Sequence, residues 1–328
     1  APLARNTSSK FDIGRAFCNK LWNAVRFAIS NLDHVGSADR TLTLPDRWML
    51  TRLHRAVHRI EDAVAAYQVN TYADAIYDLA RRDFCDWYLE AIKPTIQSSP
   101  QQQIVLRCVL DSILRLLHPI CPFITETLWP HVRSKQNDAN ATIPGITLGP
   151  SDLLATAPWP DIACSIEDAS GHDAFERIRN LVEAIRALRG EHKVPDKRRI
   201  TLCASPDVFD LINSSGPVAA ALAGLETIKP FDRSAAESGD QVVVFTFEGQ
   251  EQLLLDLAEA ADPAVERARL EQEVTALEKS IAALSGRLNN PGYAQKAPEK
   301  LVNETRQQLA DAERERTLKQ AAIDRLGR

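Results

Sequence analysis

Residues 11–32 read FDIGRAFCNKLWNAVRFAISNL, and the apolar side chains in this stretch recur at steps of three and four residues. That spacing places the apolar side chains on one face of an α-helix and the polar ones on the others. The stretch therefore predicts a helix buried along one side. The buried stripe runs through Phe17, Cys18, Leu21, Val25, Ala28, Ile29 and Leu32.

Four further helices are expected before residue 134. Pro45 and Pro100 stand at two of the starts, where the missing N–H of proline costs nothing, and Pro119 ends the helix that begins at Pro100. The expected helices cover residues 45–67, 72–92, 100–117 and 124–131. Because few β-type alternations interrupt them, residues 1–133 predict an antiparallel helical bundle in a mainly α protein.

A change of composition follows the bundle. Residues 134–160 are rich in Asn, Pro and Gly, which is typical of a linker. Residues 161–262 then mix both periodicities and predict a small α+β connecting domain. Its expected helices cover residues 173–192, 208–213 and 218–222, and its strands lie at 199–204, around 227, at 241–248 and at 252–257.

The last segment, residues 263–328, has the clearest periodicity. Its apolar residues alternate at steps of four and three, as in a heptad seam: Leu270, Val274, Leu277, Ile281, Leu284 and Leu288. Turn formers follow at residues 289–292, and Pro298 can start a returning helix that runs on through Val302, Leu309, Ile323 and Leu326. The segment predicts an antiparallel coiled-coil hairpin that projects roughly 40 Å. Thr305, Arg316 and Lys319 interrupt the returning seam.

The net charge of −5 is unevenly distributed. Residues 1–133 hold 16 Lys+Arg against 13 Asp+Glu, residues 134–262 hold 11 against 21, and residues 263–328 hold 12 against 10. A polyanionic partner would prefer the two basic ends, since phosphates are bound by Lys and Arg. No uncharged apolar run approaches the roughly 18 residues of a membrane helix, so we expect a cytoplasmic protein without membrane contact.

Metal binding is not expected from the sequence. The six cysteines stand far apart without a CxxC pair, which suits reduced thiols, most of them buried in helices. His54 and His58 have the four-residue spacing of a zinc pair, but Arg55 stands where a metalloprotease carries glutamate. The histidines are therefore interpreted as surface residues or as residues that face RNA.

No catalytic constellation stands out either. The chain has no phosphate loop of the GxxxxGK type, no GxGxxG and no GxSxG motif. Asp83 and Asp86 are interpreted as surface charges of a helix rather than an acid/base pair. We therefore predict no catalytic residues in this chain.

Several segments of the bundle resemble the valyl-tRNA synthetase family. GRAFCNKLWNAVRF at residues 14–27 is very similar to the segment that opens the anticodon-binding bundle of these enzymes. DRWMLTRL at 46–53 and FCDWYLE at 84–90 resemble the next two family segments. HPICPFITETLW at 118–129 resembles the segment that closes the bundle in class I synthetases for aliphatic amino acids, which include the isoleucyl enzyme.

The C-terminal arm decides between these enzymes. The seam of residues 270–288, followed by NNPGYAQKAP at 289–298, resembles the coiled-coil hairpin of bacterial valyl enzymes. Isoleucyl enzymes often end in cysteine-rich zinc ligands, which this sequence lacks. The resemblance covers nearly the whole chain and is weakest over residues 134–262.

The resemblance implies a parent enzyme that joins valine to tRNA(Val) with ATP. The HIGH-type and KMSKS-type signatures of the ATP-binding catalytic domain are absent, and the closest approach, TSSK at residues 7–10, is not one. We therefore expect this chain to need no cofactor, to be inactive alone, and to supply grip and identity reading on tRNA.

Candidate RNA contacts follow from the same resemblance. In related class I synthetases the first bundle helix meets the anticodon, and Asn19, Asn23 and Arg26 lie on adjacent faces of that helix. The candidates in the bundle are Arg15, Asn19, Lys20, Asn23, Arg26, Arg52, Arg55 and Arg59. In the family the arm lies against the outer corner of the tRNA, which makes Lys279, Arg287, Lys296, Lys300 and Arg306 its candidates. Trp22, Trp48 and Trp87 are interpreted as core residues.

Two other functions remain open at this point. One is the equivalent part of an isoleucyl-type synthetase. The other is a protein-interaction module, whose bundle and coiled coil bind protein partners. We expect a monomer, with self-association through the arm as the alternative.

Overall fold

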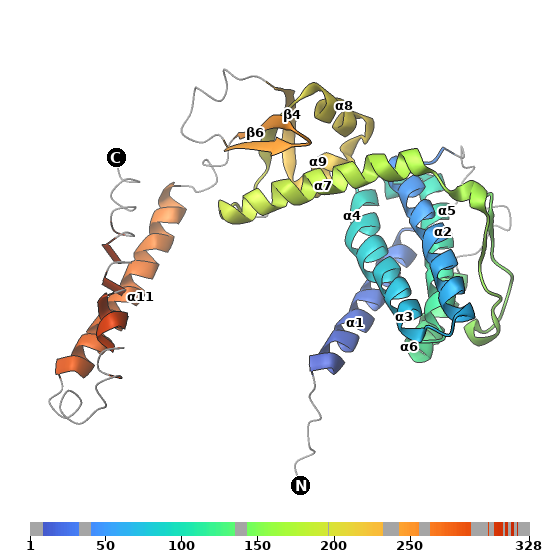
Figure 1. The fold of residues 1–328 in the computed structure, drawn as a ribbon, viewed down its shortest axis with the longest axis horizontal. Coiled ribbons are helices and arrows are strands. Elements are labelled where there is room, and N and C mark those ends of the chain that lie inside the picture. The colour runs from blue at the N-terminus through green and yellow to red at the C-terminus, as the bar shows by residue number, and fades with distance from the viewer. Residues whose placement is uncertain are drawn as a thin grey trace, which may run out of the picture. The chain divides into compact units, whose positions relative to one another are not determined.

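A computed structural model describes most of the chain, in two compact units. The described residues are 9–32, 41–134, 143–195, 197–231, 243–255, 263–289, 301, 305–310, 312–313, 316–317 and 320. One unit contains residues 1–191 and 199–255, and the other contains residues 192–198 and 256–328. The described part is mostly helical with two small sheets, which confirms the predicted fold class at that level (Figure 1).

The first 134 residues form helices at the expected places. α1 covers Ser9–Ser30, α2 Leu44–Ala65, α3 Val69–Tyr77, α4 Leu89–Ile92, α5 Pro100–Leu117 and α6 Pro122–Arg133, with a short 3-10 turn at Ile96–Ser98. Every residue of α5 from Gln101 to Leu117 is buried, so this helix lies at the centre of the helical group. The other helices bury one stripe each, as their periodicity predicts.

The start of α2 is held by a buried carboxylate. Asp46 is fully buried, and its Oδ2 accepts hydrogen bonds from the backbone N and the hydroxyl of Thr43 at 3.0 and 2.6 Å. The hydroxyl of Tyr88 donates to Oδ1 of Asp46 at 2.7 Å. Burial raises the pKa of Asp46, while these hydrogen bonds act to lower it. The cap therefore ties α2 to the segment that carries Tyr88.

Residues expected to form one α-helix over 72–92 include a different helix type. Between α3 and α4, the eleven residues Asp78–Tyr88 form a π-helix, labelled η1. The wider turn still presents Phe84, Trp87 and Tyr88 to the core. A π-helix is uncommon, and nothing in the 3.6-residue pattern announces it.

The described part of the expected linker, residues 143–160, packs on the helices instead of separating two domains. This segment contains the short elements β1 Ile146–Thr147 and η3 Leu154–Thr156. Directly after it come β2 Asp161–Ile162 and η4 Cys164–Ile166. Residues on both sides of this segment belong to one compact unit.

A buried arginine of α5 fastens this segment. Arg115 donates to Oδ1 of Asp111 at 2.6 Å and to the carbonyls of Pro158 and Gly149, each at 2.8 Å. Its guanidinium also lies 5.0 Å from the centre of the Trp129 ring. The side chains of Arg115 and Asp111 are 3% and 1% exposed. The sequence gives no sign of this arrangement, because its partners are up to 43 residues apart.

α7, Ala169–Glu191, connects the helical group to the larger sheet (Figure 1). Near its start, Glu176 accepts a hydrogen bond from the indole of Trp48 at 2.8 Å. The guanidinium of Arg179 lies over the rings of Trp48 and Trp87, at 5.5 and 4.7 Å from their centres. Near its end, Arg186 donates to the carbonyl of Leu222 at 2.8 Å.

The sheet has four strands in the order β4-β3-β6-β5. Its elements are β3 Ile200–Ala204, α8 Pro206–Ser214, α9 Pro217–Ala223, β4 Leu225–Pro230, β5 Val243–Phe247 and β6 Gln250–Leu255. β3 and β4 are parallel, and β6 is antiparallel to β3 and β5. Glu248 and Gly249 form the β5–β6 turn with φ of 50° and 78°, as a two-residue hairpin turn requires.

The second unit contains α11, Pro263–Asn289. Val274 is buried, and Leu277, Ile281, Leu284 and Leu288 are half-buried, as the heptad seam predicts. Thr305, which interrupts the returning seam, is buried with its hydroxyl donating to the carbonyl of Leu301 at 2.8 Å. The described positions from 301 to 320 are helical, and the tip at 290–300 lies outside the described residues. The antiparallel hairpin itself stays a prediction.

Candidate functional site

One face of α1 is free of packing and carries three of the predicted contacts. Asn19, Asn23 and Arg26 are exposed, and none of their side chains forms a hydrogen bond or ion pair with a residue that the structure describes. The opposite side is buried, with Leu21 1% and Val25 0% exposed. α1 therefore presents two amides and a guanidinium together on its outer face.

Trp22 lies on the same face, and its interpretation as a core residue is wrong. Trp48 and Trp87 are buried as expected, at 0% and 8%, whereas Trp22 is 42% exposed. The position of Trp22 in the sequence could have indicated its exposure. Trp22 stands three residues after Asn19 and four before Arg26, so it shares the polar face rather than the buried stripe. We call Asn19, Trp22, Asn23 and Arg26 the outer face of α1.

The two other cations predicted on α1 are paired. Arg15 donates to Asp12 at 2.8 Å, and both side chains are largely exposed. Lys20 donates to Asp86 of η1 and is half-buried. Burial lowers the pKa of Lys20. The pair with Asp86 gives Lys20 a structural partner within the helical group.

The predicted arginines of α2 are divided between different partners. Arg52 donates to Oδ2 of Asp83 at 2.8 Å, and Asp83 is only 4% exposed, so its interpretation as a surface charge is wrong. Burial raises the pKa of Asp83, although Arg52 acts to lower it. Arg55 donates to Oε1 of Glu167 at 2.8 Å. Arg59 is exposed and forms no ion pair with any carboxylate in the described part of the chain.

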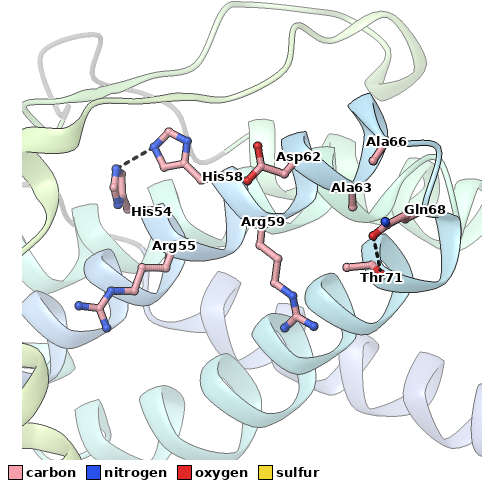
Figure 2. A pocket seen from close by; sticks show the side chains of 9 residues that line it. All are labelled: His54, Arg55, His58, Arg59, Asp62, Ala63, Ala66, Gln68 and Thr71. Atoms are coloured by element: carbon pink, nitrogen blue, oxygen red, sulfur yellow. Dashed lines mark hydrogen bonds between the residues drawn. The ribbon is translucent and has the colours of Figure 1, made fainter.

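Arg55 and Arg59 line an open hollow beside α2, with a volume of about 550 Å³. Figure 2 shows its lining, which includes two imidazole rings on successive turns of the helix. The Nε2 atoms of His54 and His58 are 2.9 Å apart, within hydrogen-bond distance. Burial lowers the pKa of His54, and the neighbouring His58 lowers it further. His54 is buried rather than on the surface, so its interpretation as a surface residue is wrong.

Three of the arm candidates lie on described parts of the second unit. Lys279 and Arg287 are exposed on α11, and Arg306 is exposed on the returning segment. Lys296 and Lys300 lie outside the described residues.

None of the helices in the described ranges combines the length and the apolar character of a membrane span.

Two family models match separate parts of this chain. Residues 46–204 match the model of the anticodon-binding domain of tRNA ligase, and residues 262–327 match that of the valyl tRNA synthetase tRNA binding arm. The valine–tRNA ligase of Thermotoga maritima is 31% identical over 316 residues, which are 95% of this chain and 34% of that protein. The valine–tRNA ligase of Dechloromonas aromatica is 34% identical over 326 residues, 92% of this chain and 33% of that protein. The chain thus spans about a third of the length of these relatives.

Proposed function

Because the chain belongs to the valyl-tRNA synthetase family, we propose that it is the tRNA-binding part of an enzyme that joins valine to tRNA(Val) at the expense of ATP. The match to the anticodon-binding domain covers residues 46–204, from α2 through β3, and the match to the tRNA-binding arm covers residues 262–327. These two parts supply grip and identity reading, and the chemistry belongs to a catalytic domain whose signatures this sequence lacks.

The outer face of α1 is the observation that supports anticodon reading best. An anticodon loop offers unstacked bases, which proteins bind with amides, guanidinium groups and aromatic rings. Asn19 and Asn23 supply amides, Arg26 a guanidinium and Trp22 a half-exposed ring, all on one side of one helix. These side chains can bind a base edge, a base face or a phosphate without first breaking a hydrogen bond or ion pair within the described part of the protein.

The remaining cations of the helical group have a supporting role in this proposal. Arg59 is the α2 arginine that lies open to a phosphate, while Arg52 and Arg55 stabilise the scaffold through Asp83 and Glu167. Arg15 and Lys20 flank the outer face and would contact RNA only by giving up Asp12 and Asp86. An exposed ion pair such as Arg15–Asp12 contributes about 0–1 kcal/mol, so exchanging it for a phosphate costs little.

The arm contributes phosphate contacts through Lys279, Arg287 and Arg306, joined by Lys296 and Lys300. Lysines and arginines spaced along a helical limb bind a folded RNA by shape and backbone charge, with little reading of bases. We place this contact at the outer corner of the tRNA. The acidic middle segment, with 11 Lys+Arg against 21 Asp+Glu, acts as a spacer that does not touch RNA.

Binding of the 328-residue chain to valine tRNA tests this proposal. The comparison uses the same tRNA with a swapped anticodon, two salt concentrations, and a shortened chain that ends at residue 262. We expect salt-dependent binding that weakens both with the swapped anticodon and without the arm. No aminoacylation is expected from the chain alone.

Absence of binding at low salt would refute the proposed grip on tRNA. Self-association through residues 263–328 without any RNA binding would instead favour a protein-interaction module. Equal affinity for both anticodons would refute the role of the outer face of α1 while leaving the role of the arm intact.

A further inference from the structure

Three metal-ligating side chains converge where η4 crosses α2. His54 and His58 come from successive turns of α2, and Cys164 comes from η4, more than a hundred residues later in the sequence. One ligand atom from each of the three residues lies within 4.8 Å of the other two. Metal binding was not expected at the histidine pair, because Arg55 stands where a metalloprotease carries glutamate. Folding of residues 143–168 against α2 adds Cys164 as a third potential ligand.

We propose that His54, His58 and Cys164 form a binding site for a divalent cation of the zinc class, with the fourth position open to water. Imidazole nitrogen and thiolate sulfur are the ligands that zinc prefers. A tetrahedral zinc ion with ordinary bond lengths needs its ligand atoms about 3.3–3.6 Å apart. The two Nε2 atoms are 2.9 Å apart, so the rings need to separate by about 0.4 Å to hold zinc, and the exposed Cys164 can approach them by rotating its side chain.

The other nitrogen of each ring lies near a carboxylate. Nδ1 of His54 is 3.9 Å from Oε2 of Glu167, and Nδ1 of His58 is 3.4 Å from Oε2 of Glu61. Metal-bound histidines usually direct their second nitrogen to a carboxylate or carbonyl, which fixes the ring and makes it a better ligand. The second nitrogen of each ring thus has a carboxylate within 3.9 Å, which a small rotation can bring into hydrogen-bond distance.

His54 also contains an unsatisfied polar atom. Its Nδ1 is buried and has no hydrogen-bond partner, because Glu167 is just beyond reach. Leaving a buried nitrogen without a hydrogen-bond partner destabilises a fold, so a native structure rarely does so without a reason. Binding of a cation at Nε2 fixes the proton on Nδ1 and strengthens its attraction to Glu167. Arg55 holds that carboxylate in place by its own hydrogen bond of 2.8 Å.

The charges around the site are mixed but permit a cation. Arg59 lines the same hollow as the two histidines and opposes a positive charge, and Asp62 lines it with the opposite sign. Arg55 is already neutralised by Glu167. A thiolate at Cys164 adds a negative charge directly on the metal. A bound cation would join η4 to α2. The segment 143–168 would then be held to the helices at two places, by the cation at Cys164 and by Arg115 at Gly149 and Pro158.

Titration of the metal-stripped 328-residue chain with Co²⁺ and Zn²⁺ tests this site. Cobalt reports its own ligands, since one thiolate in a tetrahedral set gives a sulfur-to-metal charge-transfer band and intense visible bands. We expect one Co²⁺ per chain with both signals, and displacement by Zn²⁺ with a dissociation constant below about 1 μM. Competition with a chromophoric chelator measures the zinc affinity.

The informative variants are at exposed positions, where folding should not depend on the side chain. Cys164→Ser should remove the charge-transfer band, and both Cys164→Ser and His58→Gln should weaken zinc binding by at least about 100-fold. Glu61→Ala should weaken it by about 10-fold through His58. Cys18→Ser and His131→Gln are the matched controls, from α1 and α6, and should bind as the unaltered chain does.

Either of two results would overturn the proposal. One is a charge-transfer band that survives Cys164→Ser or disappears in Cys18→Ser. The other is an unaltered chain that binds no cobalt or zinc at micromolar concentration. Binding of tRNA is measured separately, so loss of this proposal leaves the proposed function untouched.

Discussion

The outer face of α1 and the arginines of α2 and α5 use similar side chains for opposite purposes. Arg26 on α1 is exposed and unpaired within the described residues, whereas Arg52 and Arg115 are bound to the buried carboxylates Asp83 and Asp111. We call Arg47, Arg52, Arg55 and Arg115 the strut arginines, because each joins its helix to another part of the same unit. A basic residue on a helix is thus a good candidate for an RNA contact when its side chain is exposed and has no carboxylate partner within the same fold.

The largest effect is expected at a strut. Arg115→Met leaves Asp111 buried beside an apolar side chain and removes the hydrogen bonds to Pro158 and Gly149. Breaking a buried ion pair from one side typically costs about 3–5 kcal/mol, and we expect a loss of that size in urea-induced unfolding. Arg59→Met is the matched control, expected to change stability by no more than about 0.5 kcal/mol. Equal losses in the two variants would contradict the distinction between strut and free arginines.

The second largest effect is expected on the affinity for tRNA. Trp22→Ala should weaken tRNA binding by about 1–3 kcal/mol, the usual contribution of an aromatic ring stacked on a base. Because Trp22 is 42% exposed, we expect a smaller loss in the free energy of unfolding than for a fully buried tryptophan such as Trp48. Phe123→Ala is the control, since Phe123 is 88% exposed on α6 and is not part of the outer face of α1. If Trp22→Ala binds tRNA normally, the outer face of α1 does not read the anticodon.

A smaller effect is expected from the free guanidinium of α1. Arg26→Gln should cost about 1 kcal/mol of tRNA binding and reduce the slope of log affinity against log salt by about 0.7 if Arg26 neutralises a phosphate. Lys229→Gln, at an exposed lysine of β4, should leave both quantities unchanged. An unchanged slope together with lower affinity would mean that Arg26 contacts a base instead.

The smallest effect concerns acid stability of the strut Arg47. Its hydrogen bond to Asp168, 2.5 Å long, and the backbone N of Gly171 hold the pKa of Asp168 well below its usual range. The folded state therefore binds fewer protons than the unfolded state, and the stabilisation is present above about pH 4 and fades as the pH falls further. For so exposed a pair it amounts to no more than about 1 kcal/mol.

Asp168→Asn isolates this charge, because asparagine can still cap the start of α7. Urea-induced unfolding between pH 3 and pH 7 should show a difference between the two proteins at neutral pH that narrows as the pH falls. A difference that stays constant with pH would mean that the charge of Asp168 is not what stabilises this contact.

The local pattern of the sequence was enough to find the helices and strands. Prolines at 45 and 100 and the apolar spacing located α2, α5 and α6 to within about two residues, and the alternating strands located the larger sheet. The π-helix at Asp78–Tyr88 was missed, since its apolar residues also fit an ordinary helix. Short-range regularity predicts where an element lies better than which hydrogen-bond pattern it adopts.

Long-range pairing explains the remaining errors at the candidate site. Arg52 and Asp83 are 31 residues apart, and Arg55 and Glu167 are 112 apart, so neither pair has a local signature. The proximity of Cys164 to His54 and His58 was missed for the same reason, because these residues are far apart in the sequence. Trp22 is different, because its place among Asn19, Asn23 and Arg26 was visible from the sequence, and only a general preference for buried tryptophan concealed it.

α7 gives the first unit a mechanical property that its separate elements do not have. One end of this single helix is held to the helical group by Glu176 and Arg179, and the other is held to α9 by Arg186. Melting either the sheet or the helical group would remove part of the packing of α7, so neither can lose order without weakening the other. Calorimetry of residues 1–255 should accordingly record one cooperative heat-absorption peak, in which the sheet and the helical group melt together.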